Sequence, residues 1–311
     1  LDLVGLGTVC DMVPLTGPNR LLVRAGFQQM ALKRNIGLKA LCEVGGIKKD
    51  PTPDDAGFVL GPRINAGSRV HQADLGAKLL SCDDPEEAKN LAWLLNDCNA
   101  KRRSIQADMM RDAVDMIEQR GLADRPLIMV ADESWHVGLN GLVAGQIKER
   151  YGKPACCIAF APGLSGQLEG RGSGRSVAGF NMAALFMAAK EAGLLLKGGG
   201  HAMAAGFTVT PDKIAALDEF FVSEADKIAG GLDLVSEEVV DGIASIRGVR
   251  PDFVKVLQDN VGPFGQENPE PRFVLPSVRI VMADIVGESH VRLQITDMEG
   301  GARMKAVAFR S

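Results

Sequence analysis

Residues 198–206 read Gly-Gly-Gly-His-Ala-Met-Ala-Ala-Gly, and this stretch is the most constrained in the chain. Three consecutive glycines place bare backbone amides in a row, and such amides can hold an anion that no side chain crowds. A helix-like run over 182–196 precedes the stretch and a strand-like run over 206–210 follows it. Two interpretations stay open here: a tight helix-to-strand connection with a buried histidine, or an anion site around His201.

Strands and helices alternate around this stretch. Apolar runs at 127–131 and 154–160 predict strands, and the intervening and following runs predict helices over 137–151, 181–195 and 212–228. Such alternation is typical of an α/β domain. We assign this domain to residues 122–230.

A long helix precedes the α/β domain. Asp83-Asp84-Pro85-Glu86 is a helix start, with acidic residues in the first turn and proline near N1, and no breaker follows until about residue 120. We therefore assign residues 81–121 to a connecting helix and residues 1–80 to a preceding domain. Lys101-Arg102-Arg103 lies midway along this helix, where a charge run usually marks a solvated face.

The last segment, residues 231–311, reads as a small antiparallel β-barrel. A rigid proline- and glycine-rich loop at 262–271 is followed by strand-like runs at 278–286, 290–296 and 304–309. An OB-type barrel is one such fold, although periodicity alone does not select it. The segment has a basic tilt from Arg272, Arg279, Arg292, Arg303 and Lys305.

Composition limits the class of protein. The net charge is −4, from 35 basic and 39 acidic residues, so no global basic field attracts nucleic acid. Aromatic residues make up 5%, which argues against broad stacking surfaces. The six cysteines lack CxxC spacing and fit free thiols in a reducing cytoplasm, and no run of about 18 apolar residues suggests a membrane span. The chain lacks an initiator methionine and stops within a strand-like run, so we interpret it as a fragment cut at both ends.

Two stretches in the first domain carry candidate functional residues. Asp11 is an acid within an apolar stretch, where a charge is costly unless it is paired or bound to a metal; the alternative is a helix cap. Residues 57–69 read as a glycine-rich loop on which Arg63 and Arg69 flank Asn65. Two guanidinium groups there could converge on a phosphate, or both could simply face solvent.

The α/β domain adds two more polar stretches. His136 follows the first predicted strand, at the edge where α/β sheets bind ligands. Residues 173–176, Ser-Gly-Arg-Ser, offer two hydroxyls, a guanidinium and glycine-exposed amides, all of which suit a phosphate. Three polar, glycine-rich loops in one domain favour an anion site over an ordinary connection.

The order of motifs resembles the RecJ family of single-strand-specific DNA exonucleases, within the DHH phosphoesterase superfamily. The resemblance covers essentially the whole chain. The stretches that carry it are Gly-Thr-Val-Cys-Asp-Met-Val-Pro-Leu (7–15), Gly-Pro-Arg-Ile-Asn-Ala-Gly-Ser-Arg (61–69), Gly-Ser-Gly-Arg-Ser (172–176), the 198–206 stretch, and Gly-Pro-Phe-Gly-Gln-Glu-Asn-Pro-Glu-Pro (262–271).

The resemblance implies an α/β fold made of the end of a DHH domain, a long connecting helix, a DHH-associated domain and a truncated C-terminal OB barrel. It implies metal-dependent removal of nucleotides from the 5′ end of single-stranded DNA, in recombination and repair. Two divalent cations, Mn²⁺ or Mg²⁺, would serve the reaction. A cytoplasmic monomer is expected, with single-stranded DNA, a single-strand-binding protein and a helicase as partners.

The resemblance also implies roles for individual residues. Asp11 matches the last metal-binding aspartate, and His201 matches a glycine-rich histidine that we take as catalytic. Because the earlier DHH motifs are absent, we expect the missing N-terminal residues to supply most of the metal site, and we expect the fragment to bind DNA without cleaving it. The competing interpretation is a DHH-family phosphodiesterase of cyclic dinucleotides or very short oligonucleotides. Residues expected to contact substrate are Arg63, Asn65, Arg69, His136, Ser173, Gly174, Arg175, Ser176, Gly199 and Gly200.

Overall fold

The structure is a computed structural model that describes residues 1–229, 239–287 and 290–309. It divides into two compact units. The terminal unit comprises Leu1–Asn35, Ile47–Gly61 and Ser236–Ser311, and the central unit comprises Ile36–Gly46 and Pro62–Val235. The predicted domain boundary between 230 and 231 lies outside the described residues. No helix in the described ranges combines the length and the apolar character needed to span a membrane.

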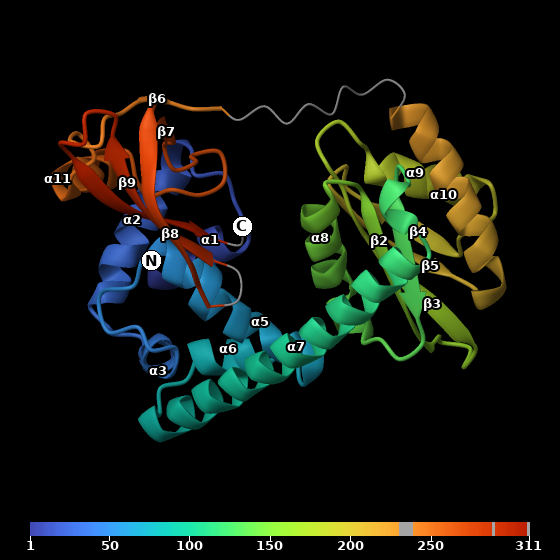
Figure 1. The fold of residues 1–311 in the computed structure, drawn as a ribbon. Coiled ribbons are helices and arrows are strands. Elements are labelled where there is room, and N and C mark those ends of the chain that lie inside the picture. The colour runs from blue at the N-terminus through green and yellow to red at the C-terminus, as the bar shows by residue number, and fades with distance from the viewer. Residues whose placement is uncertain (230–238, 288–289, 310–311) are drawn as a thin grey trace. The chain divides into compact units, whose positions relative to one another are not determined.

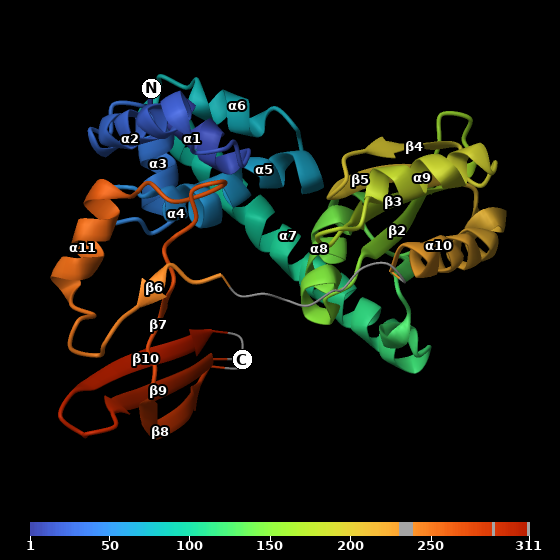
Figure 2. The same cartoon turned by 90° about the horizontal axis from the view of Figure 1, so that it is seen from above.

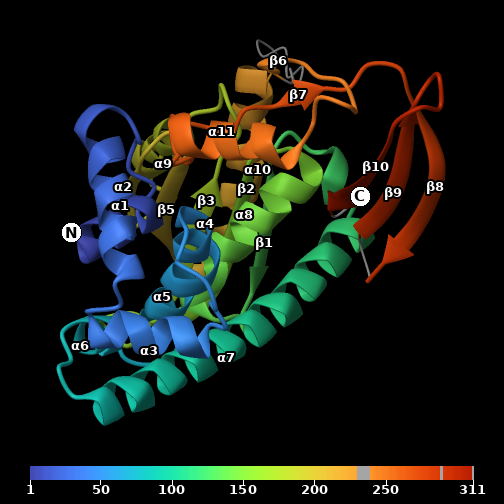
Figure 3. The same ribbon diagram turned by 90° about the vertical axis from the view of Figure 1, so that its left-hand side faces the viewer.

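Helices form the first part of the central unit. Figure 3 shows α3 (Ile36–Val44) and α6 (Leu75–Leu80) beside the N-terminal end of α7 (Pro85–Gln119). The predicted long helix is confirmed as one unbroken element of 35 residues. Its N-cap is Asp84, whose carboxylate accepts a hydrogen bond from the Glu87 amide at 2.7 Å and so satisfies one of the free donors of the first turn.

A mixed five-stranded sheet follows, which confirms the α/β class (Figure 1). Its strand order is β1-β2-β3-β5-β4; the β1–β2 pair is parallel and the remaining pairs are antiparallel. A short helical turn, η2 (Leu122–Asp124), leads from α7 into the sheet. The strands are β1 (Ile128–Asp132), β2 (Ala155–Pro162), β3 (Leu168–Arg175), β4 (Lys197–Gly200) and β5 (Ala204–Val209).

Each face of the sheet has its own core. One core gathers side chains from α9 (Met182–Glu191) and α10 (Ile214–Ala229), the latter entered through η4 (Pro211–Lys213). The other gathers side chains from α7 and α8 (Asn140–Tyr151). Figure 2 shows α9 and α10 set apart from α8 across the strands. Because strand residues alternate between faces, the adjacent buried thiols Cys156 and Cys157 enter different cores.

Strand β3 corrects the expectation that the Ser-Gly-Arg-Ser stretch at 173–176 is a polar loop, because the strand extends to Arg175. Every second residue is a glycine because large side chains occupy the α9–α10 side. A methyl group at Gly172 would lie 2.1 Å from Phe207 Cζ, and one at Gly174 would lie 2.6 Å from Phe186 Cζ. The alternate positions, Ser173 among them, face α8.

Residues 57–69 also differ from the expected glycine-rich loop. They form a π-helical segment, η1 (Ala56–Leu60), followed by α5 (Gly61–Val70). The glycines provide space for packing in place of turns. A methyl group at Gly61 would lie 2.7 Å from Cys10 Sγ, and one at Gly67 would lie 2.8 Å from the Gln72 carbonyl oxygen.

The triple glycine is neither a helix-to-strand turn nor a row of free amides. Gly198, Gly199 and Gly200 belong to β4, which pairs with β5 as a hairpin at the edge of the sheet. The hairpin turn is closed by the His201 amide, which donates to the Ala204 carbonyl at 2.8 Å. Gly200 has φ +145°, and a methyl group there would lie 2.5 Å from Ala205 Cα, so only glycine fits.

The terminal unit joins segments from both ends of the sequence. Its helices are α1 (Asp2–Cys10), α2 (Gly17–Ala31), the short α4 (Pro53–Asp55) and α11 (Pro251–Asn260). A two-stranded parallel sheet pairs β6 (Gly242–Ile243) with β7 (Phe273–Val274). The three predicted C-terminal strands are present as β8 (Val278–Val286), β9 (His290–Asp297) and β10 (Arg303–Phe309). They form an open antiparallel sheet with β9 in the middle, which agrees with the truncated barrel that was expected.

Two arginines of α2 bind the C-terminal end of α11. Arg24 Nη2 donates to the Gly262 carbonyl at 2.6 Å and to the Asp259 carbonyl at 3.3 Å. Arg20 Nη2 donates to the Asn260 and Val261 carbonyls. The last carbonyls of a helix carry partial negative charge and lack partners within the helix, so the two cations cap it.

Candidate nucleic-acid interface

The C-terminal end of β3 meets the first turn of α8 in the central unit. Arg175 Nη1 donates to Ser173 Oγ at 3.2 Å and to the Gly174 carbonyl at 2.9 Å. Gly141 makes room for this guanidinium, because a methyl group there would lie 2.5 Å from Arg175 Nη2 and 3.1 Å from Ser173 Oγ. The pair therefore lies against the start of a helix, where free amides and the helix dipole favour an anion.

A second arginine reaches the same turn from α5. Arg69 Nη1 donates to the Gly138 carbonyl at 3.0 Å. Gly138 belongs to η3 (Val137–Leu139), the helical turn that leads into α8, and its amide donates to His136 Nδ1 at 3.1 Å. The pKa of Arg175 is lowered first by burial and then by the positive charge of Arg69. Two guanidinium groups thus repel each other at one helix start, and an anion between them relieves that repulsion.

Arg63 and Asn65 also lie on α5, in the expected order but on a helix. Arg63 Nε donates to the Asn96 side-chain oxygen on α7 at 3.1 Å. Its pKa is lowered first by burial and then by the charge of Arg103. Asn65 has an exposed side chain, and its carbonyl accepts from Ser68 Oγ at 3.0 Å.

Other predicted substrate residues lie elsewhere. Ser176 is 1% exposed and its hydroxyl donates to the Phe180 carbonyl at 2.7 Å, so it is sealed inside the fold. Strand β5 separates Gly199 and Gly200 from Ser173 and Gly174. His201 is exposed in the hairpin turn next to them. The structure therefore brings together Arg69, His136, Ser173 and Arg175, and it places the glycine-rich histidine on a neighbouring part of the same sheet.

The described residues do not surround Asp11 with further metal ligands. Asp11 is the exposed C-cap of α1, and its amide donates to the Gly7 carbonyl at 2.9 Å. It therefore ends α1, whereas the alternative considered from the sequence was that it caps the following helix. Within the described residues, no group of three or more His, Cys, Asp or Glu side chains could hold a metal ion. Mg²⁺ and Mn²⁺ require several oxygen ligands each, so the residues present do not fit a two-metal centre. Burial, and to a smaller extent the neighbouring carboxylate of Asp11, raises the pKa of the Cys10 thiol to about 11.

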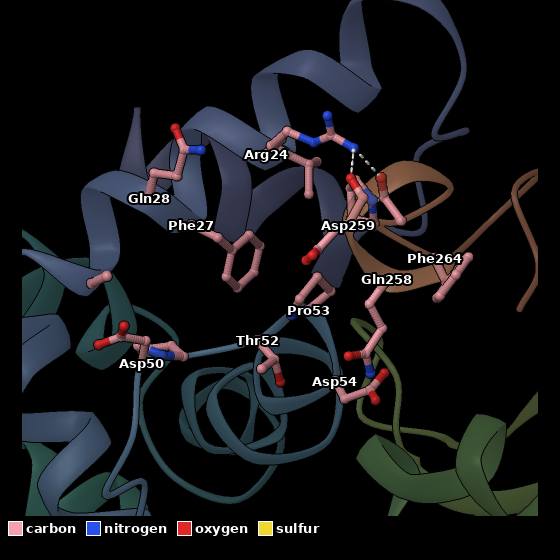
Figure 4. A pocket seen from close by; sticks show the side chains of 15 residues that line it. Arg24, Phe27, Gln28, Asp50, Thr52, Pro53, Asp54, Gln258, Asp259 and Phe264 are labelled. Carbon is pink, nitrogen blue, oxygen red and sulfur yellow. Dashed lines mark hydrogen bonds between the residues drawn. The ribbon is translucent and has the colours of Figure 1, made fainter. Parts of the chain in front are cut away.

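The terminal unit contains a cavity of about 640 Å³ between α2, the segment around α4, and the loop after α11 (Figure 4). Phe27 and Phe264 line it together with three carboxylates, those of Asp50, Asp54 and Asp259. Arg24 also lines the cavity, but three carboxylates against one guanidinium leave the lining negative, which repels a phosphate backbone. The cavity is therefore not a candidate for binding the strand.

The C-terminal sheet offers a second basic surface. Arg279 and Arg303 both pair with Thr296, and Lys305 pairs with Gln294, so the three cations share one face of the sheet. None of them forms an ion pair with another described residue. Phe309 lies on the same face and is 75% exposed. Basic and aromatic side chains on one face suit a single strand, which is held by electrostatics and stacking.

Sequence reasoning missed the residues that shape the first site. Gly138 and Gly141 flank the start of α8, in a stretch that reads only as the beginning of an amphipathic helix. Gly138 leaves space for the backbone of Arg69, which is 69 residues away in the chain, and Gly141 leaves space for the guanidinium of Arg175, which is 34 residues away. The available signal was a pair of glycines, two and five residues after His136, which is unusual at the start of a helix because glycine disfavours helix.

Two known domain families match segments of the chain. The DHHA1 domain matches residues 124–227 and the RecJ OB domain matches residues 240–311. Fold and site together thus define an α/β protein in which a DHH-associated domain precedes an OB-type segment. The chain is 38% identical over 321 residues to the single-stranded-DNA-specific exonuclease RecJ of Dickeya dadantii and 38% identical over 320 residues to that of Escherichia coli. The chain belongs to the RecJ family.

The match covers 99% of this chain and 54% of each of these two relatives, so the chain spans about half their length. A crystal structure of Thermus thermophilus RecJ in complex with Mg²⁺ aligns with 98% of this chain and 46% of its own, at 29% identity and a TM-score of 0.82. The form in complex with Mn²⁺ aligns with 98% of this chain and 43% of its own, at 30% identity and the same TM-score.

Proposed function

We propose that this chain binds 5′-phosphorylated single-stranded DNA and forms the strand-holding part of a 5′–3′ exonuclease of recombination and repair. The observation that carries the proposal is the site at the start of α8. Arg69 and Arg175 converge there with Ser173, and the hydrogen-bond partners of the two guanidinium groups among the described residues are neutral oxygens. Charge-assisted bonds to a phosphate are stronger than these neutral contacts, so a terminal phosphate is the ligand that the site fits.

The basic face of the C-terminal sheet supports a polymeric ligand. Arg279, Arg303 and Lys305 can contact the backbone, and Phe309 can stack on a base. These contacts require only a charged backbone and a base face, so we expect little sequence preference.

Binding without cleavage is part of the proposal. The described residues do not supply the several oxygen ligands that two hydrolytic metal ions need. When bound, such ions activate water and neutralise the leaving oxygen; this chain's own residues hold and orient the strand. An assay of the purified chain with Mn²⁺ and a 5′-labelled oligonucleotide should show no release of nucleotides, and robust turnover would contradict this part.

A phosphodiesterase of cyclic dinucleotides or very short oligonucleotides is the second candidate. It also needs a phosphate site on the associated domain, but it has no use for an additional single-strand-binding segment. The match of residues 240–311 to the RecJ OB domain therefore favours the exonuclease. Tighter binding of a cyclic dinucleotide than of an eight-nucleotide strand would reverse this preference. A single-strand-binding protein and a helicase are further expected partners, and co-purification with this chain tests each of them.

The central test compares 5′-phosphorylated and 5′-hydroxyl oligonucleotides by fluorescence anisotropy. Arg175→Ala should weaken the phosphorylated strand about tenfold more than the hydroxyl-ended strand, because one charge-assisted contact to the terminal phosphate is lost. The matched control is Arg171→Ala, four residues earlier on the same face of β3, where the exposed side chain makes only a 3.5 Å contact to the Pro162 carbonyl. Equal losses for both strands would rule out the terminal-phosphate role.

A further inference from the structure

The buried face of α7 changes character in the middle of the helix. Its first half buries small and apolar residues, among them Ala88, Ala92 and Leu95, and its last turns bury Met109, Ala113 and Ile117. Between these two stretches, the same helical spacing places Asn99, Arg102 and Gln106 on this face of the helix.

These three polar side chains form one unit. Arg102 Nη2 donates to Asn99 Oδ1 at 2.7 Å, and Arg102 Nη1 donates to Gln106 Oε1 at 2.7 Å. Asn99 is only 6% exposed, so its amide is fixed by packing. Because both Nη atoms of Arg102 donate to neutral amides, its guanidinium is held in one orientation and keeps its full charge. A structural arginine would ordinarily be neutralised by a carboxylate.

Arg102 and Arg103 extend the group of arginines at the start of α8, and we call Arg175, Arg69, Arg102 and Arg103 together the arginine row. Its pKa is lowered first by burial and then by the positive charges of Arg69 and Arg103. Arg102 Nε is sealed from solvent and has no hydrogen-bond partner among the described residues. Across the described chain no carboxylate lies within 4 Å of Arg69, Arg102, Arg103 or Arg175, whereas Arg111 on the same helix pairs with Asp108 at 2.8 Å. The positive charge of the row is therefore uncompensated, and it extends beyond what one phosphate can neutralise.

We propose that the middle of α7 is a second phosphate subsite, at which Arg102, oriented by Asn99 and Gln106, and the exposed Arg103 bind backbone phosphates beyond the terminal phosphate at Arg69 and Arg175. This inference rests on the proposed function. It assigns a role in strand binding to a charge run that helix periodicity alone marks as a solvated face. The ligand class is a strand of several nucleotides, because a single terminal phosphate leaves the second half of the row unoccupied.

The test measures binding by Arg102→Gln and Arg103→Gln of 5′-phosphorylated oligothymidylates of two and eight nucleotides, at several salt concentrations. We expect each variant to lose about tenfold more affinity for the eight-nucleotide strand than for the dinucleotide. The slope of log affinity against log salt for the longer strand should fall by about 0.7, the value for one phosphate contact on a single strand. Arg111→Gln is the matched control, because this exposed arginine of the same helix is already paired with Asp108 and should bind both strands like the unmodified chain.

Each outcome decides between the alternatives. Equal losses for both lengths would show that Arg102 only positions Arg69 and would overturn the subsite, as would no loss for either length. If thermal unfolding shows that Arg102→Gln does not fold, Arg103→Gln carries the test, since Arg103 is exposed and its side chain forms no hydrogen bond or ion pair with another described residue. Arg102→Lys, which keeps the charge but not the fork, should restore the salt slope. If the unmodified chain binds neither strand, the proposed function itself fails; if it binds both and the variants show no dependence on length, only the inference fails.

Discussion

At the scale of the residue, the candidate site depends on glycines as much as on arginines. Gly141 leaves the space that Arg175 occupies beside α8, and Gly138 supplies the carbonyl that holds Arg69. A methyl group at Gly141 would compete with the Arg175 guanidinium, and one at Gly138 would lie 2.8 Å from the Arg69 carbonyl oxygen. Arg171, Ser173 and Arg175 face α8 only because the glycines between them leave the opposite face to Phe207 and Phe186.

Gly141→Ala should therefore weaken binding of a 5′-phosphorylated strand about tenfold, by displacing the Arg175 guanidinium from its anion contact. The fold should tolerate it, because the displaced atom is the tip of a flexible side chain and alanine is the better helix former. Gly145→Ala is the control: it lies on the same helix, and no atom lies within 4 Å of the added methyl group. Anisotropy titrations with thermal unfolding of both variants check this, and unchanged affinity for Gly141→Ala would contradict the placement of Arg175.

At the scale of the element, glycine-rich segments form regular structure here. The alternating glycines of 170–174 belong to β3, those of 198–200 to β4, and Gly61 and Gly67 to α5. Each was expected to be a loop because glycine favours turns in isolation. Close neighbours on the adjoining strands decide otherwise: Phe207 for Gly172, and Ala205 for Gly200.

Replacing Gly172 by alanine should destabilise the central unit by about 1–3 kcal/mol, the usual cost of overpacking a core. The added methyl group would lie within 2.4 Å of three atoms of the Phe207 ring, so the whole ring must shift. Gly199→Ala, also in a strand but with no atom within 4 Å, should stay within about 0.5 kcal/mol of the unmodified chain. Urea unfolding measures both; equal stabilities would refute the packing role of Gly172.

At the scale of the whole molecule, sequence order and spatial order differ. The terminal unit unites residues from both ends of the chain, and the loop 262–271 is part of that union. The Leu15 amide donates to the Gln266 carbonyl at 2.7 Å, and a methyl group at Gly265 would lie 2.7 Å from Leu15 Cδ1. The loop 262–271 thus holds the N-terminal and C-terminal segments of the terminal unit together.

Removing both arginines of this junction, in Arg20→Ala/Arg24→Ala, should destabilise the terminal unit by about 1–3 kcal/mol, because the carbonyls at the end of α11 lose charged donors. Hydrogen exchange of the α11 amides should speed up, while exchange in the central-unit sheet should not change. Arg34→Ala, an exposed arginine with no hydrogen bond or ion pair to another described residue, is the control. Protection of α11 that equals that of the unmodified chain would show that the arginines do not hold it.

The sequence by itself determined the elements whose signals are local. Apolar runs and caps predicted α7, β1, β2 and the three C-terminal strands nearly to their ends, because periodicity and capping act within a few residues. The motif order also indicated the family. Only the tertiary structure decided what the glycines do and which polar residues meet. Arg69, Gly138, Gly141 and Arg175 converge through contacts between distant segments, and no local pattern encodes such contacts. For the same reason the stretch at 198–206, for which a tight connection and an anion site were both open, is the β4–β5 hairpin at the edge of the sheet, in which Gly200 leaves room for Ala205.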